Sequence, residues 1–160
     1  MSATAAPMTE QDRELIIKRT FDAPRDLVWK AWTTPEMAMH WWGPIEYPAN
    51  YIDMDFRVGG KWRGCLHGRD DGKDLWQGGV FKEITPPRRL VYTFKWDTDG
   101  ERGIETIVTI EFAEKDGQTL MTFHQSAFES LNERDGHGYG WGSTFDRFDI
   151  YLAQQMGIPT

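Results

Sequence analysis

The feature that most constrains the fold is a one-sided helix near the end of the chain, predicted over residues 139–156. Its large apolar side chains recur every three or four residues, at Trp141, Phe145, Phe148, Leu152 and Met156. This spacing places them along one face of an α-helix. Gly157 and Pro159 are expected to end the helix. We therefore expect a long terminal helix whose aromatic face is covered by the rest of the chain.

Most of the chain between residues 51 and 128 is predicted to form β-strands. Ile52, Met54 and Phe56 alternate with charged residues, which is typical of a strand with one buried face. Similar alternation, interrupted by turn residues, covers residues 61–67, 74–84, 90–96, 104–112 and 119–125. With a first strand over residues 14–21, the sheet has seven antiparallel strands. A twisted sheet of this width is expected to curl rather than stay flat.

Two short helices are predicted between the first strand and the others. Asp22 is a candidate cap and Pro24 a first-turn residue of the first helix, and Gly43-Pro44 is expected to end the second. The predicted fold is therefore α+β, a curved sheet wrapped around the terminal helix. We expect a disordered polar tail over residues 1–12 and a single domain over residues 13–157.

Charge and cysteine content exclude several classes of function. The chain has 18 Lys and Arg against 25 Asp and Glu, a net charge of −7, and no basic stripe that would bind nucleic acid. No apolar run reaches the roughly 18 residues that insertion into a membrane requires. Cys65 is the only cysteine, so a disulfide framework is excluded. Without a recognisable secretory signal in the first twelve residues, we expect a cytoplasmic protein.

The aromatic content predicts a cavity. The chain has eight Trp, nine Phe and five Tyr. Nine of them are expected to converge between the sheet and the terminal helix and to line the cavity: Trp62, Phe81, Tyr92, Phe94, Trp96, Phe123, Trp141, Phe145 and Phe148. Rigid rings can wall a void that flexible aliphatic side chains would fill. The alternative is that these rings simply form a dense core.

Catalytic chemistry has only weak candidates. Glu83 lies two residues after Phe81 in a predicted strand, so both are expected on the same, inward face. A carboxylate there must be paired or have a raised pKa. A structural ion pair with Arg63 or Arg89 competes with an acid–base role for Glu83 and Tyr92. None of the four histidines, His40, His67, His124 and His137, has zinc-site spacing, so we expect neither a metal nor a cofactor.

Glycine occupies every second position from residue 136 to residue 142. The segment lacks the lysine and the spacing of a phosphate-binding loop. We predict that it is a flexible start to the terminal helix where the backbone approaches its neighbours closely. A further hypothesis is that it moves as a gate to the cavity.

Four segments resemble a known family. Residues 21–44, 55–63, 78–94 and 140–148 are similar to the AHSA1-type domain, related to the activator of the heat-shock-protein-90 ATPase, in the START-like (SRPBCC) superfamily. The resemblance implies a β-α-α-β6-α helix-grip fold, also called birch-pollen-allergen-like, around an internal cavity. Similar sequences often carry histidine where this chain has Gln125; here His124 lies one residue earlier and is expected on the opposite face.

The resemblance does not imply one activity, because related domains include lipid carriers, cyclases and chaperone regulators. Our leading hypothesis is binding of a small hydrophobic or aromatic molecule in the cavity, without catalysis. The alternatives are a cyclase- or hydrolase-like enzyme that uses acid–base residues of the cavity, and a co-regulator of a chaperone ATPase. The exposed edge strands of the sheet could also pair between two copies of the chain, which makes a homodimer a further expectation.

Overall fold

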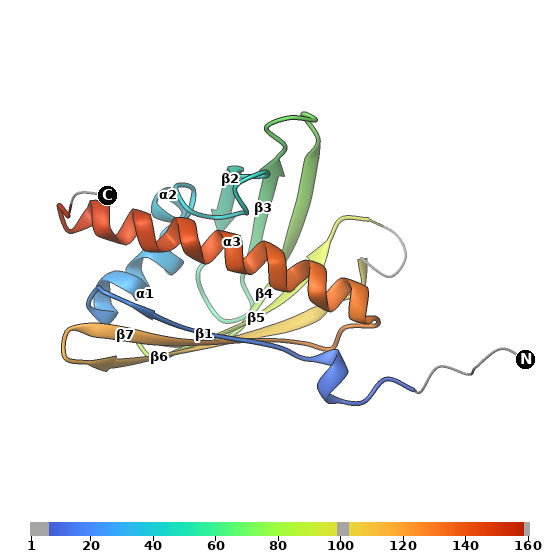
Figure 1. Ribbon diagram of the computed structural model, residues 1–160, viewed down its shortest axis with the longest axis horizontal. Coiled ribbons are helices and arrows are strands. Elements are labelled where there is room, and N and C mark those ends of the chain that lie inside the picture. Colours follow the sequence, from blue (N-terminus) through green and yellow to red (C-terminus); the bar gives the residue numbers. More distant parts are fainter. Residues whose placement is uncertain (1–6, 99–102, 159–160) are drawn as a thin grey trace, which may run out of the picture.

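A curved seven-stranded antiparallel sheet forms the body of the protein, and one long helix, α3 (Leu131–Gln155), lies across it (Figure 1). The computed structural model describes residues 7–98 and 103–158. In sheet order the strands are β1 (Leu15–Phe21), β7 (Gln118–Ser126), β6 (Thr106–Lys115), β5 (Arg89–Trp96), β4 (Asp74–Thr85), β3 (Lys61–His67) and β2 (Ala49–Met54). The predicted α+β helix-grip fold is confirmed.

Two short helices, α1 (Arg25–Thr33) and α2 (Pro35–Ala38), follow the first strand as predicted. Pro24 is the N-cap of α1 and no side chain caps this helix, so the cap expected at Asp22 is wrong. Of the tail expected over residues 1–12, residues 1–6 lie outside the described part of the chain. Gln11–Arg13 form a 3-10 helix, which the expected disordered tail did not anticipate.

The helix α3 begins well before the predicted residue 139. The Ser130 hydroxyl oxygen accepts a hydrogen bond of 3.1 Å from the backbone N–H of Glu133, which caps the helix. The glycines of residues 136–142 therefore lie inside α3, and the flexible segment expected there is wrong. At the other end Gly157 has a φ of +73°, as a residue that ends a helix often does. Met156, expected on the buried face, is 45% exposed.

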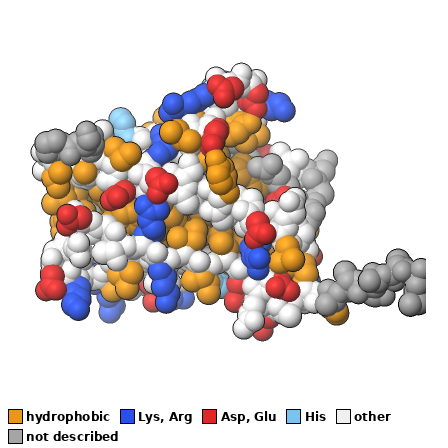
Figure 2. Space-filling model, in the orientation of Figure 1, with side chains coloured by type: hydrophobic (Ala, Val, Ile, Leu, Met, Phe, Trp, Pro, Cys, Tyr) orange, Lys and Arg blue, Asp and Glu red, His pale blue; other side chains and the backbone are white. Residues whose placement is uncertain are grey.

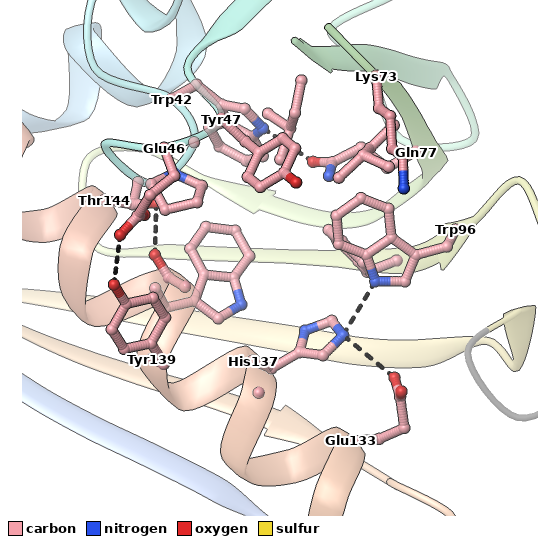
Figure 3. Close-up of a pocket in the computed structure, with 18 of the residues that line it drawn as sticks. Trp42, Glu46, Tyr47, Lys73, Gln77, Trp96, Glu133, His137, Tyr139 and Thr144 are labelled. Atoms are coloured by element: carbon pink, nitrogen blue, oxygen red, sulfur yellow. Dashed lines mark hydrogen bonds and ion pairs between the residues drawn. The ribbon is translucent and has the colours of Figure 1, made fainter. Parts of the chain in front are cut away.

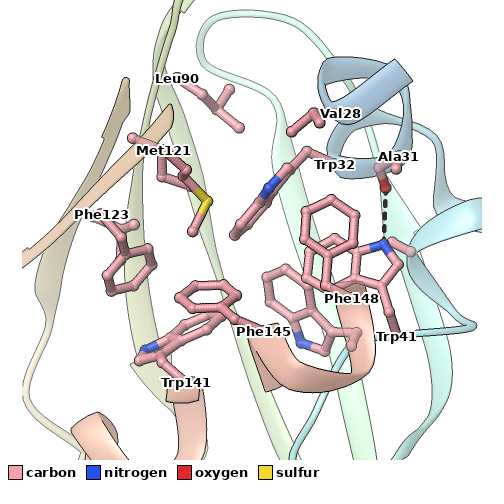
Figure 4. Packing of buried hydrophobic residues seen from close by; sticks show 14 of the residues in the cluster. Val28, Ala31, Trp32, Trp41, Leu90, Met121, Phe123, Trp141, Phe145 and Phe148 are labelled. Carbon is pink, nitrogen blue, oxygen red and sulfur yellow. Dashed lines mark hydrogen bonds between the residues drawn. The ribbon is translucent and has the colours of Figure 1, made fainter. Parts of the chain in front are cut away.

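An aromatic cluster between the sheet, α1, α2 and α3 forms the centre of the core (Figure 4). Trp32 occupies the middle of this cluster and is 2% exposed. Its ring lies within 6.5 Å, centroid to centroid, of the rings of Trp41, Trp42, Phe112, Trp141, Phe145 and Phe148. Most pairs are tilted or perpendicular, the arrangements that aromatic quadrupoles favour.

The strand alternation is confirmed along most of the sheet. In β6, Thr106, Val108, Ile110 and Phe112 are buried and face the core, and Ile110 pairs with the buried Phe123 of β7. Ile104, expected as the first member of this inward row, lies before β6 and is 41% exposed. The row thus begins only where β6 pairs with β5.

Replacing Tyr92 by phenylalanine is expected to leave the free energy of unfolding unchanged or to raise it by about 1 kcal/mol at neutral pH. The Tyr92 hydroxyl is buried and has no hydrogen-bond partner among the described residues. Burial holds the pKa of this hydroxyl well above its usual range, because the ionised form cannot be solvated.

The buried hydroxyl of Tyr92 also makes the stability of the protein depend on pH. In the unfolded chain Tyr92 ionises near pH 10, whereas in the folded chain it stays protonated. Its contribution to stability is therefore complete below about pH 10 and is lost as the pH rises further. Urea denaturation should show that Tyr92→Phe loses less stability above this pH than the natural chain does. Tyr51→Phe, at an exposed position, is the control; equal alkaline losses in all three proteins would contradict the prediction.

Candidate functional site

A pocket of about 640 Å³ lies between the first half of α3, the loop from α2 to β2, and the β3–β4 hairpin (Figure 3). Its lining residues are Trp42, Gly43, Pro44, Glu46, Tyr47, Leu66, Lys73, Leu75, Gln77, Phe94, Trp96, Asn132, Glu133, Gly136, His137, Tyr139, Gly140, Trp141 and Thr144. Several of these residues, among them Glu46, Lys73 and Tyr139, are exposed at its rim. Charged side chains gather at the tip of the β3–β4 hairpin, with apolar side chains beneath them (Figure 2).

Four aromatic rings form the walls of the pocket. Trp42 and Trp141 lie perpendicular to each other with their ring centroids 5.3 Å apart. Phe94 lies 5.3 Å from Trp96 and 6.0 Å from Trp141, again edge to face. Rings held in this way offer apolar surface for a ligand at a small cost in side-chain entropy.

Two glycines of α3 leave room for the pocket. A Cβ atom added at Gly136 or at Gly140 would meet no heavy atom within 4 Å, and both residues line the pocket. A close backbone approach was expected along this segment, but only Gly138 has a near neighbour, Leu15 Cδ1 at 3.3 Å from the added Cβ. The missing side chains therefore create space in the pocket.

A hydrogen-bond network beneath the pocket orients two of its tryptophans. Trp96 Nε1 donates to His137 Nε2 at 3.0 Å, and Trp141 Nε1 donates to Gln125 Oε1 at 2.8 Å. Because an indole N–H can only donate, His137 Nε2 is an acceptor and the proton of the neutral ring lies on Nδ1. Nδ1 then donates to Gln125 Oε1 at 3.2 Å. The fully buried Gln125 is further held by its own donation to Thr106 Oγ1 at 2.8 Å.

Two carboxylates, those of Glu46 and Glu133, border the pocket. Tyr139 donates its hydroxyl to Glu46 Oε1 at 2.5 Å, a bond that lowers the pKa of the Glu46 carboxyl and raises that of the Tyr139 hydroxyl. Glu133 Oε2 lies 4.0 Å from His137 Nε2, one helical turn away. The amide N–H of Ile45 also donates to Ser143 Oγ, which connects the α2–β2 loop to α3.

Gln77 is a buried polar residue of the pocket wall, with 2% of its surface exposed. Trp42 Nε1 donates to Gln77 Oε1 at 2.8 Å, which fixes the orientation of the amide because the indole offers only a donor. The amide nitrogen Nε2 makes no hydrogen bond to any residue of the described ranges, 7–98 and 103–158. It faces the pocket, which Lys73 and Trp96 also line (Figure 3).

Arg147 holds the segment that carries Trp42. Its guanidinium donates to four consecutive backbone carbonyls after α2, those of residues 40–43, at 2.6–3.4 Å. Gly43 in this segment has a φ of +92°, and a Cβ there would lie 2.3 Å from the Tyr47 carbonyl oxygen. The segment therefore needs both the glycine and the arginine to keep its shape.

The structure divides the nine predicted cavity residues among three places. Phe94, Trp96 and Trp141 line the pocket. Trp62, Phe81 and Tyr92 border a separate cavity of about 10 Å³, which has room for no more than about one water molecule. The remaining three, Phe123, Phe145 and Phe148, are fully buried in the core. For these three the alternative of a dense core describes their position.

Glu83 does not face inward with Phe81. The pairing of β4 with β5 shifts register between these two residues, so the strand parity from which the orientation was predicted is broken. The Glu83 side chain is 44% exposed and its Oε2 lies 3.1 Å from Arg89 Nε. This is the structural ion pair with Arg89 that was considered as the alternative. Tyr92 also lies away from the pocket, in the wall of the small cavity.

Three important residues of the pocket were not predicted: Trp42, Gln77 and His137. A signal for His137 is present in the sequence, because Ser130 and Glu133 have the spacing of a helix capping box. A helix begun at this box places His137 four residues before Trp141, on the same face. The orientation of Gln77 depends on Trp42, 35 residues away, and has no local signal.

The described ranges contain no group of three His, Cys, Asp or Glu side chains arranged to hold a metal ion. In the same ranges, no helix combines the length and apolar character that crossing a membrane requires.

Comparisons with known proteins agree with this architecture. Proteins of the same fold include one from Chromobacterium violaceum (TM-score 0.81, 22% identity, 88% of this chain and 96% of that one). Another comes from Nitrosomonas europaea (TM-score 0.77, 22% identity, 93% and 99%). A third is the AHSA1 protein from Silicibacter pomeroyi (TM-score 0.75, 24% identity, 89% and 99%).

A comparison with curated proteins finds no match. A family model described as "Activator of Hsp90 ATPase homolog 1-like protein" matches residues 22–153. This range includes strands β2 to β7 and most of α3, and it begins just after β1. The chain therefore belongs to the AHSA1 family, in the SRPBCC superfamily.

Proposed function

We propose that the protein binds a small apolar or aromatic molecule, without covalent chemistry, in the pocket beside the first half of α3. The observation that carries this proposal is a volume of about 640 Å³ with walls of tryptophan and phenylalanine. Pockets for small molecules occupy roughly 300–1,000 Å³ and combine apolar walls with a few polar groups. Ligand binding is also typical of the superfamily to which the chain belongs.

The two helical glycines support the same function. Glycine lowers helix stability by about 1 kcal/mol relative to alanine, yet two glycines lie where their missing side chains enlarge the pocket. A chain that needed only a stable core would gain from alanine at both positions. Their presence is explained if the space is used by a ligand.

The experiment fills the pocket from its helical wall. In Gly140→Leu, the new side chain enters the space next to Trp141, and affinity for 2-ethylnaphthalene should fall at least about 30-fold because the ring loses its site. Binding is measured by the change in tryptophan fluorescence during titration.

Gly142→Leu is the matched control, because Gly142 lies on the same helix but is not a lining residue, and an added Cβ there meets no neighbour within 4 Å. It should bind the probe like the natural chain. Equal affinity in all three proteins would place the binding elsewhere, and no binding to the natural chain would reject the proposal for this class of probe.

The enzymatic alternative receives no support from the positions of its candidates. Glu83 is paired with Arg89 outside the pocket, and the Tyr92 hydroxyl is enclosed away from it. Binding without catalysis is therefore the function that the geometry supports best.

A further inference from the structure

The amide nitrogen of Gln77 faces the pocket and has no hydrogen-bond acceptor among the described residues. The amide oxygen Oε1 is occupied by Trp42 Nε1, so both N–H bonds of Nε2 remain, and they form no bond with the described residues. The side chain is 98% buried and lines the pocket. An amide N–H that faces the pocket and has no acceptor among the described residues is available to donate to a ligand.

A charged side chain lines the same pocket as this donor. Lys73 lines the pocket from the β3–β4 hairpin, and its ammonium lies on the same side of the pocket as the Gln77 amide (Figure 3). The two carboxylates of the pocket, Glu46 and Glu133, come instead from the α2–β2 loop and from α3. The end of the pocket at Gln77 thus combines an uncompensated donor with a positive charge, and both favour an anionic oxygen.

We propose that the pocket selects an aromatic molecule that carries a carboxylate, with the ring against the tryptophan walls and one carboxylate oxygen accepting from Gln77 Nε2. Lys73 then attracts the charge of the carboxylate from the rim. This inference rests on the proposed function, because it assigns the polar end of a ligand whose apolar part occupies the same pocket.

Three probes of one shape test it. They are 2-naphthylacetate, its neutral amide 2-naphthylacetamide, and 2-(2-naphthyl)ethylammonium, with 2-ethylnaphthalene as the apolar reference. The natural chain should bind the acetate at least about tenfold more tightly than the ethylammonium, because a hydrogen bond to a charged group is stronger than one to a neutral group. The amide should fall between them, since its oxygen accepts from Gln77 but gains little from Lys73.

Two variants at position 77 measure how much the Gln77 amide contributes to the binding of the carboxylate. Gln77→Glu still accepts from Trp42 Nε1 but offers no donor and adds a negative charge, so acetate affinity should fall about tenfold or more. Gln77→Met removes the amide with little change in volume, and should reduce the preference for acetate over 2-ethylnaphthalene to the severalfold part that Lys73 supplies. Thermal unfolding of both variants checks that they are folded; Gln77→Met serves if the buried carboxylate of Gln77→Glu prevents folding.

Lys73→Gln should weaken acetate binding severalfold and leave amide binding unchanged, because an exposed ammonium acts on charge alone. The control is Lys82→Gln, at an exposed position of β4 that does not line the pocket. If the four probes bind equally, or if the ethylammonium binds best, the inference is overturned while the proposed function stands. If none of the four binds, the proposed function fails as well.

Discussion

Replacement of Trp32 by alanine is expected to lower the free energy of unfolding by about 3–5 kcal/mol, the range found when a fully buried large aromatic side chain is removed. Trp32 is 2% exposed, and its ring contacts six other rings contributed by the segment after α2, by β6 and by α3. Its loss would leave a cavity where these elements meet. Chemical denaturation followed by circular dichroism measures the change.

The matched variant Trp32→Phe should lose clearly less, about 1–2 kcal/mol. The reason is that Trp32 Nε1 is buried without a hydrogen-bond partner among the described residues, so the smaller ring gives up contact area but no hydrogen bond. If Trp32→Phe were as unstable as Trp32→Ala, an unseen partner of the indole N–H would have to exist, and the account of the cluster as purely apolar packing would be wrong.

Replacement of Arg147 by methionine is expected to lower the free energy of unfolding by about 3 kcal/mol. The guanidinium donates to the carbonyls of residues 40–43, and methionine keeps much of the apolar stem but no donor. The carbonyls of residues 40–43 would then lose this donor, and within the described structure only that of Trp42 would keep its bond from the Ala49 N–H. The segment with Trp41 and Trp42 would be held less firmly to α3.

Arg134→Met on the same helix is the control, because Arg134 pairs only with its exposed neighbour Asp135 in the described structure and should change stability by less than about 0.5 kcal/mol. Arg147→Lys should recover part of the loss, since one ammonium reaches fewer carbonyls than the fork of arginine. Equal unfolding energies for the variants at positions 134 and 147 would contradict the role given to Arg147.

The alternation of residues along the strands predicts most of the fold, because the strands of a sheet with one buried face carry a period of two. The same reasoning fails where pairing becomes irregular. Glu83 has the parity of Phe81, but the register shift between them turns its carboxylate to Arg89 and the surface. A bulge of this kind depends on the neighbouring strand and leaves no mark in the local pattern.

The site is less predictable than the fold, because the position of a pocket depends on which aromatic rings pack against each other. Phe145 and Phe148 fill the core while Trp141, one turn before Phe145 on the same helix, borders the pocket. The helical spacing that groups these residues cannot distinguish them. The alternating glycines predict backbone flexibility, but in the folded helix their effect is the space left by their missing side chains, which depends on the elements packed around them.

Gly136 and Gly140 have a consequence for how the binding specificity of such a protein can diverge. At both positions an added Cβ meets no neighbour within 4 Å, and any side chain other than proline is expected to stabilise the helix while it reduces the volume of the pocket. For the proposed ligand, changes of size are therefore accessible by single substitutions that raise stability, an exception to the usual rule that new specificity destabilises the fold. In descendants or designed libraries of this chain, the residues at these two positions would set the volume of the pocket without altering the core.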